Sequence, residues 1–146
     1  FGDFTVKKHA GNYDAIITGT NVFGTLTLET PDATYQYSDL QVTGGTTQTL
    51  TGFAATGTAD YKIRLASTVF GTAFNFSQTT GTVDANYTYI TDSHAAGGAA
   101  WNALTTNGNM DGGGNTGWIF AAALPSTHAP LIFRPGVILK NEVNVK

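Results

Sequence analysis

The stretch that decides the fold runs from Gly57 to Phe120, where short alternating segments follow one another. It contains Gly57-Thr-Ala-Asp-Tyr-Lys-Ile-Arg-Leu-Ala-Ser-Thr68, then Gly81-Thr-Val-Asp-Ala-Asn-Tyr-Thr-Tyr-Ile-Thr-Asp-Ser-His94, and then Asp111-Gly-Gly-Gly-Asn-Thr-Gly-Trp-Ile-Phe120. Apolar and polar residues alternate within each segment, and small or turn-forming residues close it. This pattern predicts a series of short β-strands.

The same rhythm extends beyond this stretch, because a Gly-Thr pair recurs at Gly45, Gly57, Gly71 and Gly81. Strands therefore begin about every 10 to 14 residues, which is typical of all-β proteins. Two architectures fit this spacing. One is a β-sandwich or jelly roll built from hairpins, and the other is a β-solenoid whose coils each hold two or three short strands.

Turn chemistry favours the solenoid. Hairpin signals are scarce, since Asn107-Gly108 and Asp111-Gly112 are the only Asn-Gly or Asp-Gly pairs and both fall in one loop. The tripeptide Phe-Gly-Thr also occurs at residues 23–25 and again at 70–72, a separation that fits two coils of roughly 20 to 25 residues each. We therefore predict a short right-handed parallel β-helix and keep the sandwich or jelly roll as the alternative.

Alternation along the strands also predicts the core. We expect Trp101 and Trp118 to close the end of the solenoid. The residues from 95 to 106 form the one candidate helix, although Gly97-Gly98 argues against it and residues 99–104 fit a strand equally well. The residues predicted to be largely buried are Phe74, Phe76, Val83, Tyr87, Trp118 and Phe120.

The character of the chain changes near its end. Three of the four prolines fall between Pro125 and Pro135, and proline prevents helix and removes ladder donors. We therefore predict a single all-β domain at residues 1–123 and an extended C-terminal arm at residues 124–146. The apolar residues of this arm, which we expect to contact other subunits, are Leu131, Ile132, Phe133, Val137, Ile138 and Leu139.

Composition excludes several classes of function. Charged residues make up 12% of the 146 residues, the net charge is −3, and the seven Lys and Arg form no basic stripe, so nucleic-acid binding is not expected. The longest apolar run is too short to cross a bilayer, and no cysteine is present to form disulfides or thiolate sites. Because the chain begins with Phe1, we expect a processed product or a piece of a longer chain.

Residues 40–120 resemble the coils of right-handed parallel β-helix modules in tailed-phage virion proteins and bacterial surface proteins. The resemblance rests on Thr46-Thr-Gln-Thr-Leu-Thr51, Ile63-Arg-Leu-Ala-Ser-Thr68, residues 83–93, and the closing pair Gly97-Gly-Ala-Ala-Trp-Asn-Ala103 and Asp111-Gly-Gly-Gly-Asn-Thr-Gly-Trp-Ile-Phe120. Such modules serve as spacers, caps and fibre segments. The ends of the chain match loosely or not at all.

The resemblance implies a non-enzymatic structural protein of a phage particle, such as a capsid decoration protein or a fibre or tail component. It would lie on the virion surface or outside the cell and form a homo-oligomer, with a trimer favoured, alongside other virion proteins. The first alternative is a carbohydrate-binding or adhesin module of a bacterial surface protein, and the second is a polysaccharide-cleaving β-helix enzyme.

The enzyme alternative needs clustered carboxylates. Asp84 and Asp92 lie an even number of residues apart, so on one regular strand they would point to the same side, with His94 and Asp111 as candidate neighbours. The competing interpretation is that Asp84 is solvated and Asp92-Ser93 forms a turn, and we favour it. We therefore assign no catalytic residue.

No metal or cofactor is expected. The run from Asp111 to Asn115 offers two hard ligands, whereas Ca²⁺ takes six to eight, and His9, His94 and His128 lack zinc-site spacing. No glycine-rich nucleotide motif is present. The residues that could form a stacking platform for a surface glycan are Tyr35, Tyr37, Tyr87 and Tyr89.

Overall fold

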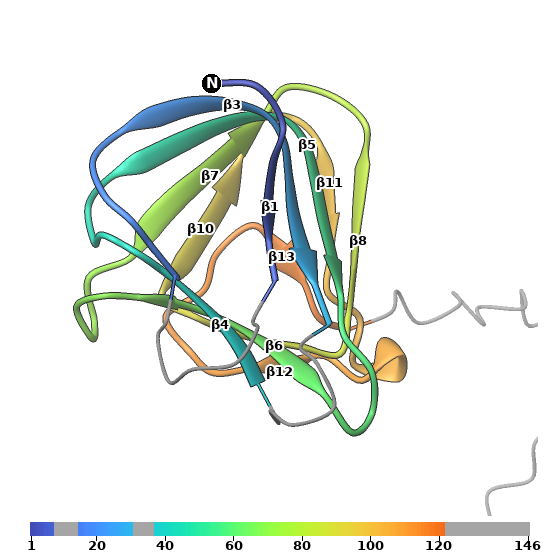
Figure 1. Cartoon of the computed structure of the whole chain (residues 1–146). Coiled ribbons are helices and arrows are strands. Elements are labelled where there is room, and N and C mark those ends of the chain that lie inside the picture. Colours follow the sequence, from blue (N-terminus) through green and yellow to red (C-terminus); the bar gives the residue numbers. More distant parts are fainter. Residues whose placement is uncertain (8–14, 31–36, 122–146) are drawn as a thin grey trace, which may run out of the picture.

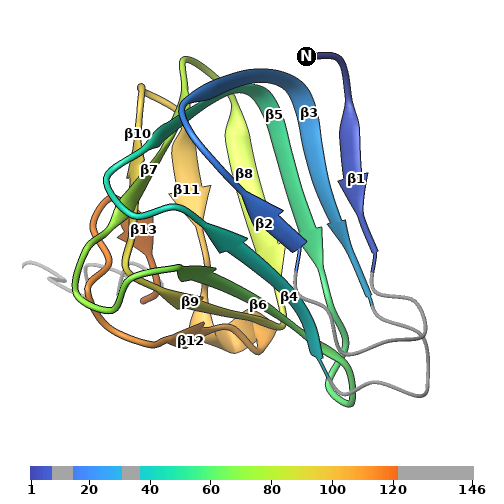
Figure 2. The same cartoon turned by 60° about the vertical axis from the view of Figure 1, so that its left-hand side comes forward.

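The computed structural model describes residues 1–7, 15–30 and 37–121. These residues form a parallel β-helix of about four turns, and the predicted fold class is confirmed. Figures 1 and 2 show the chain winding around a central core, with each coil stacked on the one before it. Every strand pairing among these residues is parallel, so the antiparallel hairpins of the sandwich alternative are not formed.

Two sheets carry the coils. The large sheet contains β1 (Phe4–Val6), β3 (Asn21–Glu29), β5 (Thr47–Thr56), β7 (Phe74–Gln78), β8 (Thr82–Asn86), β10 (Ser93–Ala96), β11 (Ala100–Asn102) and β13 (Trp118–Ile119). The small sheet contains β2 (Ala15–Ile17), β4 (Tyr37–Val42), β6 (Lys62–Ser67), β9 (Thr88–Thr91) and β12 (Met110–Asp111). A 3₁₀ helix, η1, spans Thr105–Asn107.

The large sheet covers two faces of the solenoid. In the first coils β3 and β5 bend across both faces as single long strands, whereas in later coils the same path is divided between β7 and β8 and between β10 and β11. The second division falls at Gly97 and Gly98, which have φ of 98° and 104° and approach Gln78 and Thr79 so closely that a Cβ would collide with their backbone. The candidate helix at residues 95–106 is thus mainly strand, turn and strand.

Register stacks apolar side chains of successive coils upon one another. In the small sheet Leu40 pairs with Leu65, and Leu65 pairs with Ile90. In the large sheet Val83 pairs with Trp101, and Trp101 pairs with Trp118. All of these side chains are buried, so each coil covers the apolar interior of its neighbour.

Aromatic rings fill the interior toward the last coils. Phe74 and Phe76 are fully buried and meet edge to face at a centroid distance of 5.0 Å. Trp101 and Trp118 pack edge to face at 5.1 Å, and Trp118 lies in β13, the last strand of the large sheet. Their indole N–H groups donate to Ala96 O and Ser93 Oγ, respectively. The two tryptophans therefore close the core at this end, as predicted.

Two of the predicted core residues are only partly covered. Phe74, Phe76, Val83 and Trp118 are buried, but Tyr87 and Phe120 are half-buried. Tyr87 departs because it has a φ of 48° and turns the corner between β8 and β9. After this corner the inward positions are Thr88 and Ile90, so residues 83–93 do not form the one continuous strand that alternation suggested.

The repeated Phe-Gly-Thr tripeptide does not mark equivalent positions. Phe23 is buried in β3 and pairs with Leu50, whereas Phe70 is 93% exposed in the turn after β6. The repeat therefore supported the correct architecture for the wrong reason. Parallel registration with the neighbouring coil, and not this tripeptide, defines each turn of the helix.

Candidate functional site

The two carboxylates considered for catalysis do not meet. Asp84 points outward from β8 and accepts a hydrogen bond from Asn102 Nδ2 at 2.8 Å, on a neighbouring strand. Asp92 is buried at the corner between β9 and β10, where its φ is 50° and its Oδ2 accepts from the Gly71 N–H at 2.9 Å. Asp92 thus holds two turns together, and the pair forms no acid–base constellation.

The run from Asp111 to Asn115 is occupied by internal hydrogen bonds. Asp111 Oδ1 accepts from the Gly113 N–H at 2.9 Å and from Asn115 Nδ2 at 2.6 Å. Asn115 Oδ1 accepts from the Ser93 N–H, and its Nδ2 also donates to Ile90 O. These oxygens serve the fold, and the described residues contain no group of three or more His, Cys, Asp or Glu side chains that could hold a metal ion.

Asn109 and Asn115 play the same role at two successive corners. Each corner residue, Tyr87 or Asp92, has positive φ. At Tyr87, Asn109 accepts from the Thr88 N–H at 2.8 Å and donates to Ala85 O at 2.6 Å. Asn115 makes the matching pair of bonds around Asp92, to Ser93 and Ile90. The sequence contained no local signal for this, because each asparagine comes from the following coil.

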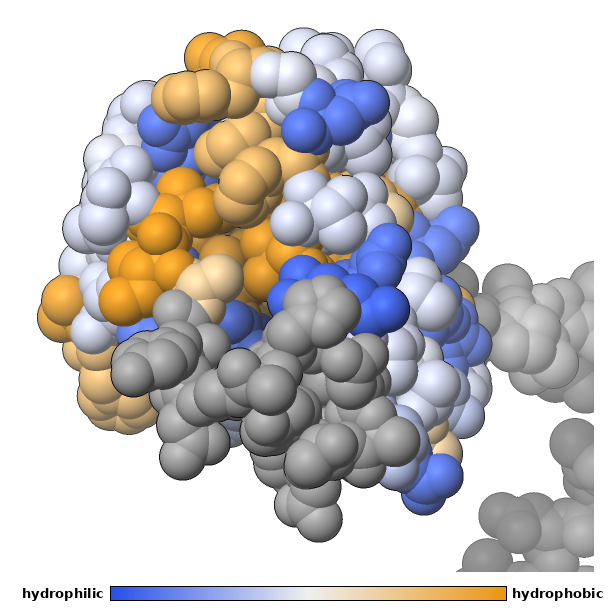
Figure 3. Space-filling view, viewed as in Figure 1, coloured by the Kyte–Doolittle hydropathy of each residue, from blue (hydrophilic) through white to orange (hydrophobic). Residues whose placement is uncertain are grey.

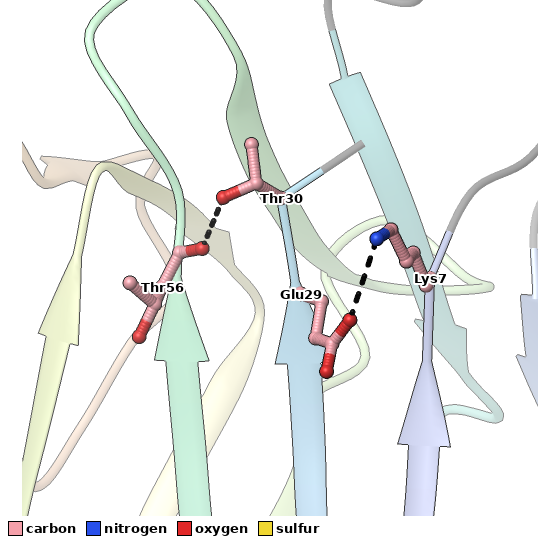
Figure 4. Close-up of polar contacts among 4 residues, drawn as sticks. All are labelled: Lys7, Glu29, Thr30 and Thr56. Carbon is pink, nitrogen blue, oxygen red and sulfur yellow. Dashed lines mark hydrogen bonds and ion pairs between the residues drawn. The ribbon is translucent and has the colours of Figure 1, made fainter. Parts of the chain in front are cut away.

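A cavity of about 390 Å³ lies where β1, β3 and β5 end. Lys7 Nζ lies 3.7 Å from Glu29 Oε2, and Thr30 Oγ1 donates to Thr56 O at 2.7 Å; Figure 4 draws both contacts. Both charged side chains are well exposed, so the ion pair contributes little energy. Its described lining contains one carboxylate and one amine beside three threonines, and no second acid.

A second hollow, of about 280 Å³, lies on the outer face of the small sheet and is lined by Lys62, Arg64, Tyr89 and Met110. Arg64 pairs in register with Tyr89, and Tyr89 pairs with Met110. Their strand neighbours Ile63, Leu65 and Ile90 are buried, so these lining residues point outward. Among the described residues, this hollow places two cationic side chains, Lys62 and Arg64, beside an aromatic ring, Tyr89.

Of the four tyrosines proposed for glycan contact, the structure brings one to a hollow. Tyr89 lines the cavity of the small sheet, whereas the ring of Tyr87 lies against Gly108 at its corner. Tyr37 occupies the strand position opposite Lys62, but its side chain, like all of Tyr35, lies outside the described residues.

The first-coil end of the solenoid exposes apolar surface. A cavity of about 340 Å³ opens there and is lined largely by Phe1, Phe4, Ile17 and Phe23. Figure 3 shows hydrophobic surface across the middle of this end. Among the described residues β1 pairs only with β3, and β2 pairs only with β4, so each presents one edge without a strand partner.

The remaining predictions concern residues outside the described part of the chain. The proposed contact residues of the arm, Leu131, Ile132, Phe133, Val137, Ile138 and Leu139, lie there, as do His9 and His128 and the boundary at residue 124. No helix in the described part of the chain is long and apolar enough to cross a membrane.

Comparison of the chain with protein-family models, with curated proteins and with solved structures gives no match. The resemblance to β-helix modules therefore rests on the sequence motifs alone.

Proposed function

We propose that this chain is a non-enzymatic structural protein that assembles through the ends of its β-helix and its C-terminal arm, as a component of a phage particle. The observation that carries the proposal is the first-coil end, where β1 and β2 each have one edge without a partner among the described residues, beside exposed apolar side chains. Ile16 of β2 is 57% exposed and Phe4 of β1 is 45% exposed at this end.

Such an end is suited to strand addition. Free N–H and C=O groups on an edge strand pair readily with an incoming extended segment, and apolar surface beside them gains free energy when it is covered. The sequence of the arm supplies a segment of this kind, with apolar residues at Leu131–Phe133 between Pro130 and Pro135 and at Val137–Leu139 after Pro135. When the arm of each subunit adds to the first-coil end of the next, these head-to-tail contacts close into a cyclic homo-oligomer, and we favour a trimer.

The assignment to a virion surface is supported by the motifs shared with phage β-helix modules and by the absence of a catalytic constellation in the described residues. A protein on a bacterial surface could use the same contacts. Assembly through the first-coil end is therefore proposed for either location, virion or bacterial surface.

Deleting residues 124–146 should leave the β-helix folded but prevent assembly. We expect the truncated protein to retain its β circular dichroism and to sediment as a monomer, whereas the full chain sediments as an oligomer. Ile16→Asp should weaken association of the full chain, because it places a charge at the proposed contact.

Phe70→Asp is the matched control, since Phe70 is more exposed than Ile16 but lies in a side turn away from the strand edges. It should leave the sedimentation coefficient unchanged. A monomeric full chain, or a truncated chain that assembles as well as the full one, would show that the arm does not mediate assembly.

A further inference from the structure

We propose that the hollow on the small sheet binds an acidic sugar unit, with the ring of Tyr89 as its platform and Lys62 and Arg64 as its carboxylate partners. The inference goes beyond assembly, because this hollow lies on the outer face of the sheet and not at the strand edges of the first-coil end.

Charge is concentrated at this hollow. Lys7, Lys62 and Arg64 are the Lys and Arg side chains of the described residues, and two of the three line the cavity. Arg64 Nη1 lies 3.5 Å from Asp39 Oδ2, so the cluster of Asp39, Lys62 and Arg64 carries a net positive charge. In a chain of net charge −3, this local excess favours an anionic ligand.

The acidic residue beyond the cavity does not cancel this charge by direct contact. Asp111 follows Met110 along β12, but its Oδ1 accepts hydrogen bonds from Gly113 and Asn115. The Arg64 side chain is 45% exposed and retains donors that can reach solvent, because a guanidinium carries five N–H groups. A carboxylate entering the hollow can therefore accept from Arg64 and Lys62 together.

The aromatic wall is held in place by a glycine. A Cβ on Gly112 would lie 2.6 Å from Tyr89 Cζ and 2.7 Å from its hydroxyl oxygen, so the tyrosine ring packs directly over the backbone of residue 112. Tyr89 is half-buried and Met110 is 50% exposed. A ring supported in this way loses little conformational entropy when a ligand stacks on it.

Size and lining select a sugar with a carboxylate. The hollow of about 280 Å³ is slightly smaller than the range of about 300–1,000 Å³ for pockets that hold drug-sized ligands, so it suits one pyranose unit of a chain. An aromatic ring beside a thioether covers the apolar face of such a unit. Lys62 and Arg64 would bind the carboxylate of an acidic sugar, a group that a neutral sugar lacks.

Met110 makes the test specific, because it is the single methionine of the chain. With the methionine methyl labelled with ¹³C, its NMR signal reports from the wall of the hollow alone. Titration of the full chain with tetragalacturonate should shift this signal with millimolar or tighter affinity, and maltotetraose should shift it much less. A polyglutamate peptide of equal charge separates sugar recognition from simple anion binding.

Variants assign the roles. Tyr89→Leu should lower the affinity for tetragalacturonate about tenfold. Lys62→Gln should lower this affinity about threefold or more, and the remaining affinity should depend less on salt concentration. Asp39→Asn should raise it about threefold, because a neighbouring negative charge is removed. Lys7→Gln is the control, since Lys7 lines a different cavity and should leave binding unchanged.

Circular dichroism and thermal melts of each variant would confirm that the fold is retained. No shift of the methionine signal with tetragalacturonate would overturn the proposal. Equal binding of maltotetraose would overturn the acidic class, and equal binding of polyglutamate would overturn recognition of the sugar. None of these outcomes bears on sedimentation of the full chain, so the assembly proposal stands or falls separately.

Discussion

Replacing Phe74 by alanine should lower the free energy of unfolding by about 3–5 kcal/mol. Phe74 is fully buried at the start of β7, and its ring meets Phe76 edge to face. The loss combines the transfer free energy of the ring with the cost of the cavity left inside a stacked coil. Equilibrium unfolding in urea, monitored by circular dichroism, would measure it.

Phe70→Ala provides the matched control for this prediction. Phe70 is the same residue type, four positions earlier in the chain, but it is 93% exposed. Its removal should change the free energy of unfolding by less than about 0.5 kcal/mol. If Phe74→Ala cost less than about 1 kcal/mol, or if the two variants behaved alike, the core of this coil would be wrongly assigned.

The contrast between these two phenylalanines also shows how far sequence reasoning reaches. Alternation correctly placed Phe74, Phe76 and Val83 inside, because β7 and β8 are short regular strands bounded by turn residues. It failed at Tyr87, because a corner formed by a non-glycine residue with positive φ reverses the phase of alternation. Nothing in the local sequence distinguishes such a corner from the middle of a strand.

The candidate binding site was predictable only in part for a related reason. Lys62 and Arg64 occupy outward positions that alternation can assign. Alternation from Val83 would place Tyr89 inside, and the corner at Tyr87 turns it outward, although Tyr89 was among the tyrosines proposed for glycan contact. Their meeting with Met110 depends on parallel register between β6, β9 and β12. Register in a solenoid is set by coil length, and this differs between coils: the paired residues Ala55 and Ala85 are much further apart in sequence than Trp101 and Trp118.

The corners impose a second requirement on stability, which the corner asparagines Asn109 and Asn115 meet. Asn109 is buried, its Oδ1 accepts from the Thr88 N–H, and its Nδ2 donates to Ala85 O at 2.6 Å and Leu104 O at 3.0 Å. At the corner the chain leaves one sheet for the other. The Thr88 N–H and the Ala85 carbonyl therefore bond to a side chain there and not to a neighbouring strand. A side-chain amide supplies a donor and an acceptor in one group.

Asn109→Ala should therefore lower the free energy of unfolding by about 2–5 kcal/mol, because it leaves a buried donor and buried acceptors without partners. Asn102→Ala is the control, since Asn102 makes an exposed hydrogen bond to Asp84, and it should cost less than about 1 kcal/mol. Urea unfolding of both variants beside the parent protein would give the two differences.

Asn109→Asp separates loss of the hydrogen bonds from loss of side-chain volume. The carboxylate keeps an acceptor for Thr88, but it faces two carbonyl oxygens, so burial and repulsion should raise its pKa in the folded state above the unfolded value of about 3.9. A folded-state pKa raised in this way makes the variant least stable relative to the parent above that pKa. The deficit should then shrink as the pH falls through it, because the protonated acid can donate to Ala85 O. A deficit that did not change with pH, or an Asn109→Ala variant as stable as Asn102→Ala, would mean that the asparagine does not hold the corner.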